Sequence, residues 1–274
     1  MRLMLLTTLA MAAFAGNSLL NRWAVGAGHA DAFGFAALRV ASGALMLWLL
    51  VRMRGASPAW RSSRRMQAVV GLAAYMLGFS AAYLALDAGT GALILFATVQ
   101  VTMFTGAALA AEPLPPRRWL GAGLALTGLA VLLWPGAGAV PAALPALAMM
   151  LAGVGWGVYS LGGQHEADPL AATAANFALC LPVVLVPLML WPPQVDAVGL
   201  ALAVASGAVT SGLGYALWFA VLPALGAGRA AVAQLGVPVL AMLGGAAILA
   251  EPPSMAAILA AAVVLGGVAL GLRR

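Results

Sequence analysis

The sequence predicts an all-α integral membrane protein with ten transmembrane helices, arranged as two inverted five-helix repeats with both termini in the cytoplasm. Three observations predict this fold: an apolar composition, a one-sided distribution of arginine and an internal repeat. Of the 274 residues, 64% are hydrophobic and only 7% are charged, and the mean hydropathy is +1.05. Water-soluble domains of this size do not have such a composition.

The chain divides into apolar stretches at short polar, Pro and Gly breaks. A helix needs about 20 mostly apolar residues to cross the hydrocarbon of a bilayer, which is about 30 Å thick. We place ten such spans at residues 3–25, 31–52, 65–86, 90–110, 118–134, 142–162, 169–191, 197–222, 229–249 and 254–272. The remaining loops are too short for a sizeable soluble domain, so the lipid bilayer is the expected surrounding of the chain.

Arginine sets the predicted orientation, because short loops rich in arginine stay in the cytoplasm. With the N-terminus inside, the cytoplasmic segments contain Arg2, Arg52, Arg54, Arg61, Arg64, Arg65, Arg117, Arg118, Arg229, Arg273 and Arg274. The opposite segments, 28–31, 87–90, 135–141, 192–196 and 251–254, contain no arginine. The high isoelectric point, about 10.7, therefore reflects topology, and we expect no nucleic-acid partner.

The N-terminus and the single cysteine each allow a second interpretation. Met1-Arg2, an apolar run and Ala13-Phe14-Ala15 together have the form of a signal peptide with a cleavage site. Because the apolar stretch continues through residues 17–25, we expect it to remain as the first span. Cys180 falls in the middle of a span, so we expect a small packing residue without redox meaning.

An internal repeat divides the chain into residues 1–136 and 141–274. A shift of 139 positions places Ala111-Glu112-Pro113 on Ala250-Glu251-Pro252 and Gly106-Ala107-Ala108 on Gly245-Ala246-Ala247. Each half then holds five spans. Because five is odd, the second half must enter the membrane from the other side, which predicts an inverted repeat. Secondary transporters often have this design, with the substrate near the membrane midplane where the halves meet.

These motifs resemble those of a known family. In each half a span ends in Gly-Ala-Ala-x-x-Ala-Glu-Pro and is followed by a Gly-rich span, and Ala37-Leu38-Arg39 and residues 155–159 also fit. The chain resembles the drug/metabolite transporter superfamily with paired EamA-type domains, closest to the YddG-type aromatic amino-acid exporters. The resemblance implies a bacterial inner-membrane exporter of small metabolites that works by alternating access. Relatives carry different amino acids, purines, sugars and cations, so aromatic amino acids are only the first expectation.

Polar and aromatic residues inside the spans outline a candidate substrate site, because polar groups in hydrocarbon are costly without a partner or a cavity. Tyr75, Phe79 and Tyr83 recur every four residues and predict one aromatic face. Aromatic walls with a few amide and hydroxyl groups suit an amphipathic planar solute. Interhelical packing or anchoring at the membrane interface is the alternative for each residue. The substrate-binding candidates are Asn17, Arg39, Tyr75, Phe79, Tyr83, Thr98, Trp156, Tyr159, Tyr215 and Gln234.

Two arginines lie inside predicted spans. Arg39 is about eight residues into the second span, about 12 Å deep by helix rise, which is too deep for its charge to reach the interface. It either holds a substrate carboxylate or bridges backbone carbonyls as a structural clamp. Arg22 is nearer the boundary, and we expect it to extend to the interface. Glu112 and Glu251 precede prolines and are expected mainly to end helices, with a gating salt bridge as the alternative.

The remaining charges bear on the energy source and on rival classes. All carboxylates and histidines fall in loops or at span ends, so facilitated diffusion is preferred, and a proton-coupled antiporter of drugs, organic cations or other metabolites is the alternative. We expect no enzyme and no cofactor, because neither a catalytic constellation nor a phosphate-binding loop is present. A channel is disfavoured because no ring of charges is visible. The two halves in one chain predict a monomer.

Overall fold

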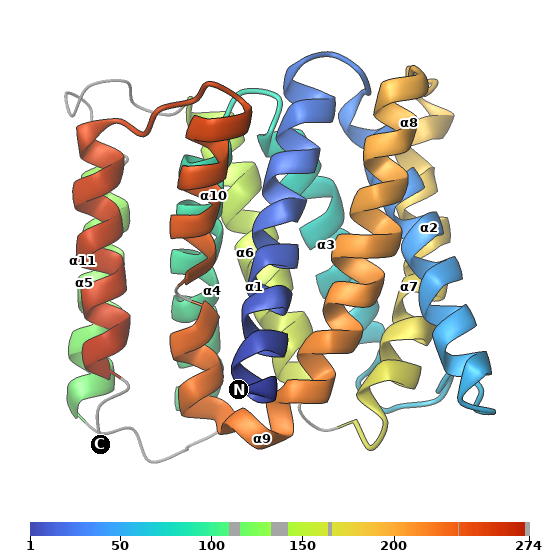
Figure 1. Ribbon diagram of the computed structural model, residues 1–274, viewed down its shortest axis with the longest axis horizontal. Helices are drawn as coiled ribbons and strands as arrows, with labels where there is room; N and C mark the ends of the chain where they lie inside the picture. Colours follow the sequence, from blue (N-terminus) through green and yellow to red (C-terminus); the bar gives the residue numbers. More distant parts are fainter. Residues whose placement is uncertain (110–115, 133–141, 164–165, 235, 272–274) are drawn as a thin grey trace.

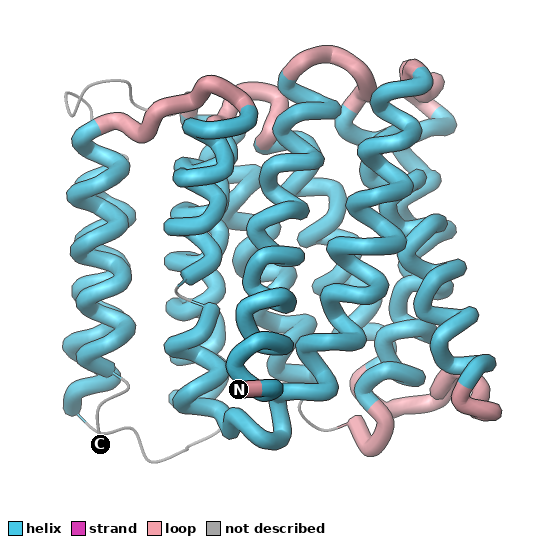
Figure 2. The backbone as a smooth tube through the Cα atoms, viewed as in Figure 1, coloured by secondary structure: helices cyan, strands magenta, loops and turns pink. Residues whose placement is uncertain are grey.

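The protein is a bundle of long helices that run side by side (Figures 1 and 2). The computed structural model describes residues 1–274 apart from 110–115, 133–141, 164–165, 235 and 272–274. Within that part the regular structure is helical, and one isolated bridge joins Ala30 to Val195. The all-α class predicted from the apolar stretches is thereby confirmed.

The helices of the first half follow the predicted stretches closely. They are α1 (Arg2–Asn21), the π-helical η1 (Arg22–Gly26), α2 (Ala32–Met53), α3 (Arg65–Ala82), α4 (Ala88–Leu109) and α5 (Pro116–Leu132). Asp31 begins α2, because its side chain accepts hydrogen bonds from the backbone N–H groups of Phe33 and Gly34. This is the N-cap arrangement that satisfies the free donors of a first helical turn.

The second half contains more irregular helix. Its elements are α6 (Ala143–Gly163), α7 (Pro169–Leu185), the 3₁₀-helical η2 (Val186–Met189), α8 (Ala197–Val204), the π-helical η3 (Ala205–Leu213), α9 (Gly214–Gln234), α10 (Gly236–Ile248) and α11 (Met255–Gly271). From α8 through η3 into α9 the helix is unbroken, so these elements together form the predicted span 197–222.

One predicted boundary is wrong. The break expected between residues 222 and 229 does not interrupt the helical backbone, since α9 continues to Gln234. Figure 1 shows that the ribbon of α9 instead changes direction at the end of the bundle where the N-terminus lies. This stretch contains Pro223, Gly226 and Gly228, and proline and glycine are residues at which helices bend. The proline and glycines of this stretch therefore mark a bend in α9 and not its end.

Six helical segments are long and apolar enough to cross a membrane by length and composition: Arg2–Gly26, Ala32–Met53, Ala88–Gly106, Ala143–Gly163, Pro169–Met189 and Ala197–Val221. Shorter apolar helices cover Trp119–Gly128, Gly236–Ile248 and Met255–Gly267. The chain is thus a membrane protein with several apolar helices. The number ten remains a prediction.

Helices of the two halves pack against each other throughout the bundle. The helix α2 packs on α7, α4 on α10 and α5 on α11, while α3 packs on α6 and α1 on η3 and α9. Glycine permits close approaches of this kind: a Cβ on Gly71 of α3 would lie 2.8 Å from the carbonyl oxygen of Gly155 on α6. Small residues at such crossings let helix backbones approach in a membrane.

Four of the five segments without arginine, 28–31, 87–90, 192–196 and 251–254, lie at one end of the bundle, drawn at the top in Figure 1. There the backbone N–H of Asp31 donates to the carbonyl of Gln194 at 2.9 Å, and that of Asp196 donates to His29 at 3.0 Å. The predicted segment 135–141 lies outside the described residues. At the opposite end α1 begins and α11 ends. We call these the arginine-poor and the arginine-rich end.

Candidate functional site

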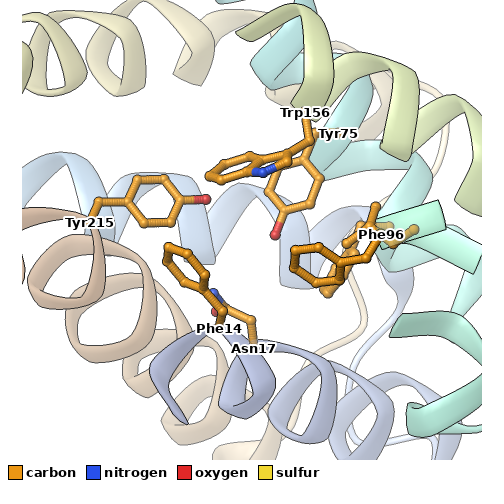
Figure 3. Close-up of a pocket in the computed structure, with 8 residues that line it drawn as sticks. Phe14, Asn17, Tyr75, Phe96, Trp156 and Tyr215 are labelled. Atoms are coloured by element: carbon orange, nitrogen blue, oxygen red, sulfur yellow. The ribbon is translucent and has the colours of Figure 1, made fainter. Parts of the chain in front are cut away.

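A cavity lies between the two halves of the chain, deep among the helices (Figure 3). The space is narrow, with room for little more than a water molecule. Its walls come from α1, α3 and α4 of the first half and from α6 and α9 of the second, and they consist of Phe14, Asn17, Tyr75, Phe79, Leu95, Phe96, Trp156 and Tyr215.

Aromatic rings form most of the wall and touch one another. The ring of Trp156 lies 5.0 Å from that of Tyr75 and 5.1 Å from that of Tyr215, centroid to centroid. Phe14 meets Tyr215 edge-on at 5.8 Å, and Phe79 lies 5.1 Å from Tyr75. These separations are those of favourable aromatic pairs. The rings of both halves therefore hold the cavity in shape.

Helix geometry explains the placement of the central pair. Tyr75 and Phe79 are four residues apart on α3, so they share one face. The close approach of α3 and α6 at Gly71 and Gly155 brings Trp156, the next residue on α6, against Tyr75. A side chain at either glycine would force the two helices apart and would widen the gap between the rings.

Asn17 joins the cavity to a hydroxyl cluster on η3. Its Oδ1 atom accepts hydrogen bonds from Ser206 at 2.9 Å, Thr210 at 2.5 Å and Ser211 at 3.3 Å. In an α-helix residues five apart do not share a face, whereas the wider π-helical turn of η3 brings Ser206 and Ser211 to one acceptor. Asn17 thus makes the interhelical hydrogen bonds weighed as its alternative role, and it also lines the cavity.

Arg39 is completely buried, with no exposed surface. Its Nη2 atom donates to the Tyr75 hydroxyl at 2.8 Å and its Nε atom to Ser211 at 3.1 Å. The guanidinium carbon lies 5.1 Å from the Tyr75 ring centroid and 5.0 Å from that of Phe79. In the part of the chain that the structure describes, no carboxylate pairs with Arg39 and its Nη1 atom has no hydrogen-bond partner.

Arg22 extends toward the segments at the arginine-poor end, where it forms an ion pair that the sequence analysis did not anticipate. Its Nε atom lies 2.6 Å from a carboxylate oxygen of Glu251, and its Nη1 atom donates to the Tyr83 carbonyl at 3.1 Å. Asp87 is a second, looser partner at 3.9 Å. Burial raises the pKa of Asp87, as does the Glu251 carboxylate, while Arg22 lowers it.

The backbone around Glu251 turns its carboxylate inward. Ala250 has a φ of 54°, a left-handed conformation that alanine adopts only at a cost. The turn lets the backbone N–H of Glu251 donate to Gly245 at 3.0 Å, and the Glu251 side chain accepts from the backbone N–H of Ala88 at 2.9 Å. Glu251 therefore does more than end a helix, because it connects the end of α10 with η1 and with the start of α4. Glu112 lies outside the described residues.

A second charged cluster lies at the arginine-rich end. Arg65 donates to the amide oxygen of Asn176 on α7 at 2.6 Å and to the carbonyls of Ala59 and Ala172. Its Nη2 atom is 3.4 Å from Glu166. Arg22 at one end of the bundle and Arg65 at the other therefore each contact a carboxylate of the second half.

Five of the ten predicted site residues line the cavity, namely Asn17, Tyr75, Phe79, Trp156 and Tyr215. Arg39 stands behind Tyr75 and Phe79 as described above, and Tyr83 packs edge-on against Phe79 at 4.8 Å. Tyr159 lies beyond Trp156, with its hydroxyl 3.2 Å from that of Thr173. Thr98 donates to the carbonyl of Ile94, and Gln234 is buried away from the lining.

Three lining residues were missed, namely Phe14, Leu95 and Phe96. Phe14 precedes Asn17 by three residues, so extending the polar face of α1 by one helical turn would have found it. On α4 the hydroxyl groups of the threonine face suggested that this face lines the site. Those of Thr98, Thr102 and Thr105 all donate to the carbonyl four residues earlier, which leaves the apolar Leu95 and Phe96 at the cavity.

Comparison with known proteins identifies one family domain and a similar fold. Residues 143–273 match the model of the EamA-like transporter family. An uncharacterized protein of Pseudomonas aeruginosa is 49% identical over 276 residues, which cover 98% of this chain and 94% of the relative. A protein crystal structure with 22% sequence identity matches with a TM-score of 0.69 and covers 98% of this chain and 96% of its own. That similarity concerns the fold alone.

Proposed function

This chain belongs to a family of proteins with an EamA-like transporter domain, and on that premise we propose that it exports small amphipathic metabolites, first of all aromatic amino acids. The export would run across a bacterial inner membrane, with a single chain as the working unit. The observation that carries the proposal is the cavity between the halves, whose walls are mostly aromatic rings. Such walls stack on a planar apolar group and exclude water from it.

Alternating access fits the arrangement of the helices. We propose that residues 1–136 and 141–274 are inverted repeats and that both termini are cytoplasmic. The pairing of α2 with α7, α4 with α10 and α5 with α11 supports this, because each pair joins equivalent spans of the two halves. Rocking of one half against the other would then expose the cavity to each side in turn. The present narrow cavity corresponds to a contracted arrangement.

Facilitated transport remains the preferred energy source. The carboxylates that the structure describes lie at helix ends or in loops, as Asp31, Asp87, Glu166, Asp168, Asp196 and Glu251 do. None of these lines the cavity. Proton-driven carriers usually place a titratable group in the pathway. The antiporter alternative would use a carboxylate at the end of a span or a relay of hydroxyl groups.

Counterflow in proteoliposomes tests this function. Vesicles of equal internal and external pH are preloaded with unlabelled phenylalanine, a nucleobase or a quaternary amine, and the uptake of labelled phenylalanine is followed. We expect uptake to be stimulated only by aromatic amino acids and to be unchanged by a protonophore. Stimulation by the quaternary amine, or loss of uptake with the protonophore, would instead support the antiporter of organic cations.

Two variants connect the transport to the cavity. Trp156→Ala removes the ring that touches Tyr75 and Tyr215, and we expect about a tenfold or larger loss of counterflow, because each of these two aromatic contacts contributes about 0.5–1.5 kcal/mol. Trp119→Ala is the matched control, since Trp119 is exposed on α5 and contacts Phe104 outside the cavity. Equal loss in both variants would separate the transport from this cavity.

A further inference from the structure

The charge of Arg39 has no balancing charge among the described residues. The side chain is fully buried, and no described carboxylate forms an ion pair with it. The removal of an isolated charge from water is costly, and charged groups inside a membrane are paired or face a cavity. The neighbouring rings and two hydroxyls offset part of the cost but leave a net positive charge beside the cavity.

Two hydrogen-bonding groups near the cavity are also unused. The Nη1 atom of Arg39 and the hydroxyl of Tyr215 are buried without a hydrogen-bond partner among the described residues. Figure 3 shows the Tyr215 hydroxyl directed toward Trp156 and Tyr75, on the side of the cavity. Buried donors are rarely left unpaired, so each such group calls for an explanation.

Arg39 lies directly behind residues of the cavity wall. Its Nη2 atom is bonded to the hydroxyl of Tyr75, and Tyr75 lines the cavity. Its Nε atom is bonded to Ser211, which also contacts Asn17 in the cavity wall. The guanidinium is thus held on two sides behind the wall, and Nη1 is the donor that remains. A planar guanidinium with a free donor suits a carboxylate.

We propose that the ligand of this cavity must carry a carboxylate, which Arg39 binds while the aromatic wall holds the rest of the molecule. The proposal rests on the proposed function and narrows its substrates to aromatic carboxylates. Organic cations are excluded by repulsion from the unpaired guanidinium. A neutral aromatic is rejected because it leaves the charge of Arg39 unbalanced. The Tyr215 hydroxyl completes the site as a second donor to the carboxylate.

A structural clamp is the rival role for Arg39. A clamp stabilises the contacts of α2 with α3 and η3 but places no demand on the ligand. The two roles therefore differ in a way that ligands alone can reveal. Phenylalanine, 3-phenylpropionate and phenethylamine share one ring and differ only in carboxylate and amine. A clamp predicts that the three compete equally, whereas a carboxylate site predicts that phenethylamine does not compete.

The first experiment uses these three compounds on the wild-type protein. Each is added outside proteoliposomes that perform phenylalanine counterflow, and its inhibition constant is measured. We expect phenylalanine and 3-phenylpropionate to inhibit at similar concentrations and phenethylamine to be weaker by about 10- to 100-fold, as is typical for the loss of a charged hydrogen bond. Equal inhibition by phenethylamine overturns the proposal even though the aromatic function stands.

Variants of Arg39 supply the second experiment. In Arg39→Met, which removes the charge at similar length, phenylalanine and 3-phenylpropionate should lose affinity by about 10- to 100-fold. Phenethylamine should not lose affinity, so its disadvantage disappears. Arg52→Gln is the matched control, because Arg52 is exposed at the end of the same helix and lies over Trp48. A retained preference for carboxylates in Arg39→Met overturns the proposal.

Two further outcomes keep the inferences separate. If Arg39→Met does not fold, Arg39→Lys keeps a positive charge without the planar fork and should retain the preference for carboxylates at lower affinity. If wild-type protein shows no phenylalanine counterflow, the thermal unfolding of purified protein is followed with the same compounds and with hexanoate, an aliphatic carboxylate. Stabilisation by aliphatic carboxylates alone would then support the Arg39 site and reject the aromatic substrate. Stabilisation by phenethylamine alone would reject the site.

Discussion

Arg39 and Arg22 are the two arginines that the sequence places inside spans, and the structure gives them opposite surroundings. Arg22 meets Glu251 at 2.6 Å and Asp87 at 3.9 Å. Arg39 meets hydroxyls and ring faces, with no carboxylate among the described residues. A charge that is balanced within the chain serves the structure. A charge that is left unbalanced beside a cavity is available to a ligand.

The same contrast separates the centre of the bundle from its ends. At the arginine-poor end Arg22 joins α1, α4 and the segment after α10, and at the other end Arg65 joins α3 to α7. In the proposed rocking of one half against the other, ion pairs that link the two halves would have to break or rearrange. Arg39, at the centre, has no such ion pair among the described residues, and it contacts the second half through the hydroxyl of Ser211.

The largest expected effect is on stability at the arginine-poor end. Arg22→Gln leaves Glu251 largely buried without its partner, since only 14% of the Glu251 side chain is exposed. We expect a loss of about 2–3 kcal/mol, somewhat below the range for fully buried pairs. Thermal or denaturant unfolding in detergent measures it. Arg39→Met should cost less, because it removes a charge that has no counter-charge to leave behind.

The stabilities of Arg22→Gln and Arg39→Met test the contrast between the two arginines. If Arg39→Met destabilises the protein more than Arg22→Gln does, Arg39 is mainly a clamp and the central charge is structural. A second check is the double variant with Glu251→Gln. Since Arg22 and Glu251 form one unit, the double variant should lose less stability than the sum of the two single variants.

The next prediction gives Arg39 a counter-charge of its own. In Asn17→Asp, three hydroxyl donors already surround the oxygen that becomes a carboxylate, and Ser211 links it to Arg39. We expect the unfolding temperature to stay the same or to rise, because hydroxyl groups and a nearby cation stabilise a carboxylate. Affinity for aromatic carboxylates should fall about tenfold, as the new carboxylate competes for Arg39 and repels the ligand.

Asn17→Leu is the control for that variant. It removes the hydrogen bonds of Asn17 without adding charge, so it should lower stability and affect carboxylate and amine ligands alike. A fall in affinity that is equal for phenylalanine and phenethylamine in Asn17→Asp would contradict the electrostatic explanation. Inhibition constants in counterflow and unfolding temperatures in detergent provide both readouts.

A smaller effect is expected at Tyr75. Tyr75→Phe keeps the ring against Trp156 but removes the hydroxyl that accepts from Arg39 at 2.8 Å. Because one hydrogen bond contributes about 1 kcal/mol, we expect about a fivefold loss of affinity for phenylalanine. Tyr159→Phe is the matched control, since its hydroxyl contacts Thr173 and not the cavity. A larger loss in Tyr159→Phe would show that the candidate site has been misplaced.

Much of the architecture could be predicted from the sequence. Helices that must cross hydrocarbon are long and apolar, so their positions follow from composition, and the arginine-free segments 28–31 and 192–196 do meet at one end. The π-helical η1 and η3 could not be predicted, since no local pattern distinguishes them from α-helix. The pairing of Arg22 with Glu251 could not be predicted either, because 229 residues separate the two in the chain and no local pattern connects them.

The candidate site shows the same limit. The aromatic face of Tyr75 and Phe79 followed from four-residue spacing, which is a local property. Whether a face is turned toward a cavity or toward a neighbouring helix depends on packing, which placed Tyr83 and Tyr159 just beyond the lining. The hydroxyls of Thr98 and its neighbours illustrate a further point. A polar residue inside a span can satisfy itself on its own helix, so polarity alone does not predict a site.

The smallest effects concern two carboxylates of the arginine-poor end whose pKa values shift in opposite directions. Burial and Glu251 raise the pKa of Asp87. The backbone N–H of Gly199 and the His29 side chain lower the pKa of Asp196. Asp196 therefore contributes stability above about pH 4, the ordinary value of Asp, and this contribution is lost as the pH falls through its lowered pKa. For Asp87 the contribution is present below about pH 4 and is lost as the pH rises through its raised pKa.

Unfolding temperatures measured between about pH 3 and pH 7 should distinguish the opposite effects of Asp87 and Asp196 on stability. At neutral pH Asp196→Asn should be slightly less stable than wild type, and Asp87→Asn slightly more stable, because the raised pKa means that its ionised form is disfavoured in the fold. Both differences should shrink in acid, where the wild-type carboxylates are themselves protonated. If Asp87→Asn instead lowers stability at neutral pH, then Asp87 is a full partner of Arg22, and Arg22 differs from Arg39 by two counter-charges instead of one.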